Sequence, residues 1–318
     1  MPSLPELPII SAEDNIVSRT LENIPGIRIK DKRVRLKIES NHYKQNMIKL
    51  DRAFNNPVIE NLQPFAINSP YMEKFLQLIK KFKSPNAVIN LIGPFTITQI
   101  LENVAEEQML IDKTYRKLFI QAVCVKALWI IKKIKEASPD TVPLIILEEP
   151  EFGKLGDIKR ENDDISIEIV TALFSRVIDK LHDAGALVGI QCLDKCDLKI
   201  PINAGVDLIS FDAYNNPNNL SILPEQIIEF VSRGGKINWG IIPTTNEATI
   251  KAINLDEMEK RLFATFENLI IAGVPTKFVY NSAYVSVQGD LEKQPLIFAE
   301  KAIILASQLA KKIPVIKD

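Results

Sequence analysis

The residues best suited to chemistry lie directly after short apolar segments of the chain. Glu148 and Glu149 follow one such segment, and Asp212 follows another, with Tyr214 two residues later. A carboxylate can bind a cationic group, or act as a general acid or base when its surroundings move its pKa towards neutrality. Glu148 and Asp212 are therefore the candidate catalytic residues. Each could equally be structural, pairing with a nearby lysine or ordering a loop.

Two cysteines offer a second kind of chemistry. Cys192 lies at the end of an apolar segment and Cys196 follows four residues later. Together with Asp212 they could hold zinc and leave one coordination position open, because thiolates and carboxylates both bind this metal. Zinc is thus a possible cofactor. The alternative is that Cys192 is a packed core residue and Cys196 a loop thiol without a ligand.

The apolar segments themselves predict buried parallel strands. They cover residues 87–92, 142–147, 187–192, 207–211, 236–242 and 277–280. Apolar residues at helical spacing occupy 119–134 and 167–181, and Ala-Gly pairs ending at Gly185, Gly205 and Gly273 are typical of helix ends. Further strand candidates lie at 33–38 and near the N-terminus. The pattern predicts an α/β protein that forms a closed eight-stranded (β/α)8 TIM barrel, as a single domain over residues 1–318.

Composition bears on partners and location. The chain has 39 basic and 40 acidic residues, a net charge of −1. We therefore expect no nucleic-acid partner, and no membrane partner since no uncharged apolar segment is long enough for a span. Three cysteines without a disulfide spacing pattern, and a start that does not resemble a signal peptide, favour the cytoplasm.

Several segments, taken in chain order at the ends of the predicted strands, resemble the catalytic half of cobalamin-independent methionine synthase and its short stand-alone relatives. They are SLP at 3–5, GPFT at 93–96, EEP at 148–150, QC at 191–192, ISFDAYN at 209–215 and WGIIPT at 239–244. This family belongs to a superfamily with uroporphyrinogen decarboxylase and the corrinoid-dependent methyltransferases, whose members share a (β/α)8 barrel. The resemblance covers nearly the whole chain.

The resemblance implies a methyl transfer in which zinc activates a thiol substrate such as homocysteine. The family's metal ligands match Gln191, Leu193, Asp212 and Tyr284, so only Asp212 remains a competent ligand and the zinc site is degenerate. The family's amino-acid contacts match Ser3 and Glu148. The expected substrate-binding residues are accordingly Ser3, Glu148, Gln191, Asp212, Tyr214 and Tyr284.

The function implied is that of a methionine synthase-like methyltransferase, which takes part in methionine biosynthesis and moves a methyl group from a corrinoid or folate donor to a thiol. At 318 residues the chain has no room for the second barrel that helps the family bind folate, so a corrinoid protein is the expected partner beside a small-molecule substrate. Two alternatives stay open: a zinc-free small-molecule binder or complex subunit, and a zinc-independent enzyme using Glu148 or Asp212. Porphyrin decarboxylation is disfavoured because the early arginines, Arg19, Arg28, Arg33 and Arg35, are scattered along the sequence.

Overall fold

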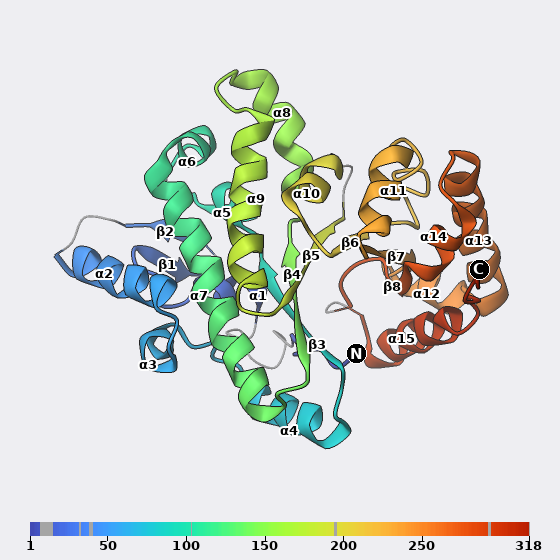
Figure 1. The fold of residues 1–318 in the computed structure, drawn as a ribbon, viewed down its shortest axis with the longest axis horizontal. Helices are drawn as coiled ribbons and strands as arrows, with labels where there is room; N and C mark the ends of the chain where they lie inside the picture. Colours follow the sequence, from blue (N-terminus) through green and yellow to red (C-terminus); the bar gives the residue numbers. More distant parts are fainter. Residues whose placement is uncertain are drawn as a thin grey trace. The chain divides into compact units, whose positions relative to one another are not determined.

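The computed structural model describes residues 1–6, 15–31, 33–37, 41–102, 104–193, 196–291 and 294–317 (Figure 1). The chain divides into two compact units, Met1–Ile190 and Gln191–Asp318. Each unit combines helices with parallel strands, as the α/β pattern predicts. The assignment of residues 1–318 to a single domain stays a prediction.

The first unit is built around strands that the sequence predicts. β3 (Asn86–Ile92) pairs in parallel with β4 (Val142–Glu148), and β5 (Leu187–Cys192) is next in the sheet order. A separate antiparallel pair is formed by β1 (Ile27–Lys30) and β2 (Arg33–Leu36). The helices are α1 (Ile16–Leu21), α2 (Asn41–Asn55), α3 (Ile59–Leu62), α4 (Met72–Phe82), α5 (Pro94–Ile100), α6 (Glu106–Ile111), α7 (Lys113–Ala137), α8 (Leu155–Glu161) and α9 (Ile167–His182), with 3-10 turns at Gln63–Phe65 and Phe152–Lys154.

Helix α7 forms much of the core of this unit. The apolar residues that predict it, from Phe119 to Ile134, are buried. Their spacing of three and four residues places them on one side of the helix, where they pack against β3, β4 and the neighbouring helices. Lys126 is buried among them, and its Nζ donates to the carbonyl oxygen of Ala66 at 3.3 Å. Within the described residues, no helix combines the length and the apolar character needed to cross a membrane.

The second unit contains three parallel strands in the order β6 (Leu208–Phe211), β7 (Lys236–Ile242) and β8 (Ala283–Val287). The Trp239 ring of β7 packs against Phe211 of β6 and Phe266 of α13, with ring centroids 5.2 and 5.1 Å apart. Asn254 caps the start of α13, because its Oδ1 accepts from the backbone N–H of Glu257. The helices are α10 (Lys199–Ala204), α11 (Pro224–Ser232), α12 (Glu247–Ala252), α13 (Leu255–Ile271), α14 (Thr276–Asn281) and α15 (Leu296–Ala310).

The predicted closed eight-stranded barrel is wrong. The described residues provide only six strands of the parallel kind, β3 to β8. Residues 33–36 instead form β2, whose exposed arginines alternate with buried Val34 and Leu36, a pattern typical of a half-exposed antiparallel strand. Within residues 1–6, Ser3 forms a single bridge, to Val88 of β3, and Pro2 and Pro5 beside it cannot donate to a longer ladder.

The last predicted strand is also misplaced. Residues 277–280 lie in helix α14, and the strand follows at Ala283–Val287. The short segment KFVY is compatible with either a strand or one helical turn, and in the structure Pro275 stands at the N-cap of α14, two residues before this segment. The strand therefore ends at Val287 and is followed by Gln288, which changes the set of residues at the site.

Candidate functional site

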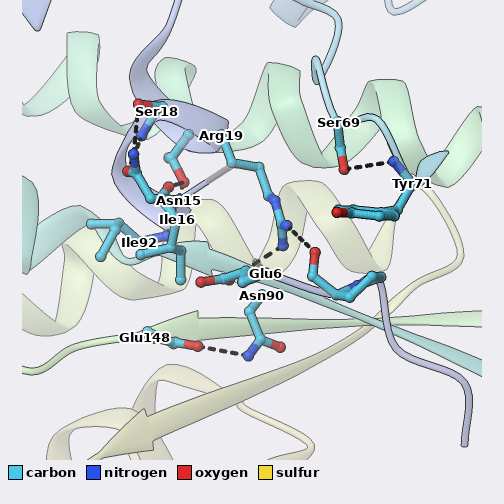
Figure 2. A network of polar contacts seen from close by, with 12 residues as sticks. Glu6, Asn15, Ile16, Ser18, Arg19, Ser69, Tyr71, Asn90, Ile92 and Glu148 are labelled. Carbon is cyan, nitrogen blue, oxygen red and sulfur yellow. Dashed lines mark hydrogen bonds and ion pairs between the residues drawn. The ribbon is translucent and has the colours of Figure 1, made fainter. Parts of the chain in front are cut away.

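In the first unit, polar side chains gather near the carboxyl ends of β3 and β4. Glu148 is the last residue of β4 and lies opposite Ile92 in the register, which places its side chain on the same face as that of Asn90. The Asn90 Nδ2 donates to Glu148 Oε1 at 2.6 Å, and both side chains are half-buried (Figure 2). This bond holds the carboxylate in one orientation.

The N-terminal segment runs beside β3 and forms polar contacts of its own. Leu4 N donates to Val88 O at 3.0 Å, and Val88 N donates to Pro2 O at 2.9 Å. Arg19 of α1 is only 2 % exposed, and its guanidinium donates to Glu6 Oε1 at 3.2 Å and to Pro5 O at 2.6 Å. Figure 2 shows the contact between Arg19 and Glu6 and, as a separate pair, the bond between Asn90 and Glu148. The Ser3 side chain is exposed.

Glu149, the next residue after Glu148, has a different environment. It is 1 % exposed, and its two carboxylate oxygens accept from the backbone N–H groups of Phe95 and Thr96 at 3.0 and 2.6 Å. Burial raises the pKa of this carboxyl to about 7, although these hydrogen bonds act to lower it. Gly93 leaves the space that the carboxylate fills, since a Cβ at this position would overlap it. Glu149 therefore fixes the first turn of α5.

The predicted site residue Asp212 lies in the second unit at the end of β6. It is 5 % exposed. Its carboxylate accepts from the N–H of Asn215 at 2.9 Å, from the Asn215 Nδ2 at 2.7 Å and from the Gln288 Nε2 at 2.9 Å. Because Gln288 follows β8, these bonds tie the carboxyl ends of β6 and β8 together. The sequence prediction missed Gln288 because it placed the last strand too early.

The surroundings of Gln288 complete a compact polar cluster. Gln288 N donates to Ile242 O at 2.8 Å, and its Oε1 accepts from Thr244 N at 3.4 Å. Gln294 Nε2 donates to the carbonyl oxygen of Thr244 at 2.9 Å. The amide groups and the Asp212 carboxylate thus bond mainly to one another. Buried polar groups in a structural network have hydrogen-bond partners in this way.

Among the described residues, neither Tyr214 nor Tyr284 donates to the Asp212 carboxylate. Tyr214 packs under Arg261, whose guanidinium carbon lies 4.0 Å from the ring centroid and whose Nη2 donates to Tyr214 O at 2.6 Å. Tyr284 is 40 % exposed and lies near the amino end of β8, opposite Asn238. It is four residues before Gln288, about 13 Å along an extended strand. Gln191 is half-buried on β5.

The candidate metal ligands do not form a metal centre. Cys192 is buried and Cys196 is half-buried. Among the residues that the structure describes, no three His, Cys, Asp or Glu side chains are grouped so that they could hold a metal ion. Both oxygens of Asp212 already accept from N–H donors. The described residues therefore do not fit the zinc site that the family resemblance implies.

Comparisons with known proteins leave the family open. No model of a known protein family matches the chain, and a search of the curated proteins finds no match.

Proposed function

We propose that this protein binds a small molecule carrying an ammonium group at the carboxyl ends of β3 and β4. The observation that carries the proposal is the half-buried Glu148 carboxylate, oriented by Asn90 at 2.6 Å. Asn90 uses its amide N–H in this bond, so its carbonyl oxygen stays an acceptor. Two acceptor groups side by side match an ammonium group, which has three donors and no acceptor.

The other two strand-end carboxylates, Glu149 and Asp212, are less suited to this task. Glu149 and Asp212 are both buried, and each accepts N–H donors on both oxygens. Displacing those donors would leave buried polar groups unsatisfied, at a cost of about 1–3 kcal/mol for each group. Glu148 is the more exposed of the three carboxylates.

The proposed ligand class is an amino acid or amine. The resemblance of residues 3–5, 93–96 and 148–150 to the methionine synthase family favours a sulfur-containing amino acid such as homocysteine. A cytoplasmic location is part of the proposal and is supported by Cys124, Cys192 and Cys196, which are all thiols.

The ligand class is tested by calorimetric titration of the purified protein with homocysteine, methionine and the analogue of homocysteine that lacks the amino group. Binding of an amino compound, with no binding of the analogue, would support the proposal. Equal binding of homocysteine and the analogue would contradict it, because the ammonium group would then make no contribution.

Methyl transfer to a thiol is the second candidate, supported by the ordered set of family-like segments at the strand ends. A corrinoid protein would be the partner that donates the methyl group. We would incubate the protein with homocysteine and a methylated corrinoid and follow methionine by mass spectrometry. Methionine formation above a no-protein control would support this candidate, and none above the control would reject it for this donor.

A further inference from the structure

The β1–β2 hairpin presents a uniformly basic face. Arg28 lies opposite Arg35, and Lys30 lies opposite Arg33, in the antiparallel register. All four side chains are exposed, whereas the alternate residues Ile27, Val34 and Leu36 are buried. Arginines that are scattered in the sequence are thus brought together on one surface.

Such an arrangement is electrostatically unfavourable by itself. Directly opposite residues in an antiparallel pair lie about 5 Å apart, and alternate residues of one strand about 7 Å apart. Like charges at these separations destabilise a hairpin. A hairpin with alternating positive and negative residues would avoid this repulsion. Four cations on one face are instead stabilised when an anion binds to them.

One carboxylate already lies against this face. Glu102 Oε1 is 3.7 Å from Arg33 Nε, and Oε2 is 3.5 Å from Arg35 Nε. The backbone positions Glu102, because its N–H donates to Val34 O at 3.0 Å. Four cations face one carboxylate, and within the described part of the chain neither Arg28 nor Lys30 forms an ion pair.

We propose that this basic face, formed by Arg28, Lys30, Arg33 and Arg35, binds a compact anion that carries two or more linked phosphate groups. Guanidinium groups bind phosphate oxygens with paired hydrogen bonds, and each phosphate offers more acceptors and more charge than Glu102 does. The face is four residues long, about 13 Å, which suits a small polyphosphate. This site is independent of the proposed ammonium site.

A nucleic acid is the less suitable ligand. Base recognition on single strands requires stacking platforms, and the outward residues of the hairpin include no aromatic side chain. The net charge of −1 also provides no wider field that would attract a long polyanion.

The proposal is tested by calorimetric titration of the whole protein with inorganic tripolyphosphate at low ionic strength. We compare wild type with the Arg28→Gln, Arg35→Gln double variant and with a control that removes two exposed cations of α4, Lys80→Gln, Lys81→Gln. The double variant should bind about 10-fold or more weakly, since two charge-assisted contacts are lost, while the control should bind as wild type does. Glu102→Gln should bind several-fold more tightly because it removes the competing carboxylate.

The substituted side chains point to solvent, so circular dichroism should show an unchanged fold. The proposal is overturned if wild type does not bind tripolyphosphate at millimolar concentration, or if both double variants lose affinity equally. It is also overturned in favour of nucleic acid if a duplex oligonucleotide binds more tightly than tripolyphosphate and only that binding depends on Arg28 and Arg35.

Discussion

Glu148 and Glu149 are consecutive carboxylates with opposite surroundings. Glu148 is half-buried and bonds to a side chain, whereas Glu149 is buried and bonds to two backbone N–H groups. The strand geometry explains the difference, because successive residues point to opposite sides. Glu148 is therefore the candidate for ligand binding, whereas Glu149 has a structural role.

Glu149 should make the stability of the protein depend on pH. Its pKa is raised from 4.5 in the unfolded chain to about 7 in the folded protein, so the folded state binds the proton more tightly. The stabilisation is fully present below pH 4.5 and is lost as the pH rises through about 7. From this shift, we expect the free energy of unfolding of wild type relative to Glu149→Gln to fall by roughly 3 kcal/mol across this range.

Chemical denaturation at several pH values between 4.5 and 7.5 measures this difference. Glu161→Gln, an exposed site in α8, is the control and should follow wild type at every pH. A wild-type advantage that grows with pH would contradict the account, because it would mean that the backbone donors outweigh burial and hold the carboxylate ionised.

Asp212 should be important for stability. Asp212→Asn replaces one acceptor oxygen by an N–H₂ group that opposes the donors of Asn215 or Gln288. We expect a loss of about 2 kcal/mol in the free energy of unfolding, typical of losing a buried charge-assisted hydrogen bond. The exposed Asp290→Asn substitution should change stability by less than about 0.5 kcal/mol. Equal effects at both positions would show that the Asp212 network contributes little.

At the scale of elements, the helices and most strands were predictable. Long apolar stripes determine α7 and α9, and Gly185, Gly205 and Gly273 have positive φ angles of 75°, 98° and 110° as helix ends require. The prediction for 277–280 failed because a four-residue segment, KFVY, is too short to show a distinguishing period. That failure hid Gln288, whose bond to Asp212 joins residues 76 positions apart. The basic face was missed because it depends on the antiparallel register of β1 and β2, which was not predicted.

The joint between β3 and α5 provides an element-scale prediction. Gly93 has an ordinary φ of −76°, so its role is space and not backbone freedom. Gly93→Ala should destabilise the protein by about 3 kcal/mol, because the added Cβ overlaps the Glu149 carboxylate and disturbs the first turn of α5. Thermal and chemical unfolding measure the loss.

A matched glycine in the same unit provides the control. Gly156 lies in α8 with nothing near its position, so Gly156→Ala should be neutral or stabilising by up to about 1 kcal/mol. Gly93→Ala should also cost less in a Glu149→Ala background, where the overlap is removed. An equal cost in both backgrounds would disprove the steric explanation.

At the scale of the whole molecule, the α/β alternation was predictable and barrel closure was not. Closure needs two additional parallel strands, and the candidates for them were the least regular segments of the sequence. In the structure one candidate is the antiparallel β2, and in the described part of the N-terminal segment, residues 1–6, the other shows a bridge at Ser3. Long-range pairing of short segments is not encoded by their periodicity alone.

The metal content of the whole protein tests the degenerate zinc site. Since the described residues form no group of three metal ligands, elemental analysis of protein purified without a metal-affinity tag should give the same zinc content for wild type and for Cys192→Ser, Cys196→Ser. Near-stoichiometric zinc that disappears in the double variant would contradict this expectation and would restore zinc-assisted thiol methylation.

The most direct test of the proposed function is the affinity of wild type, Glu148→Gln and the control Glu161→Gln for the amino compound that binds most tightly in the ligand titrations. Glu148→Gln keeps the side-chain shape but removes the charge that faces the ammonium group. We expect its affinity to fall about 10- to 100-fold, and that of the control to stay at the wild-type value. An unchanged affinity in Glu148→Gln would contradict the proposed site.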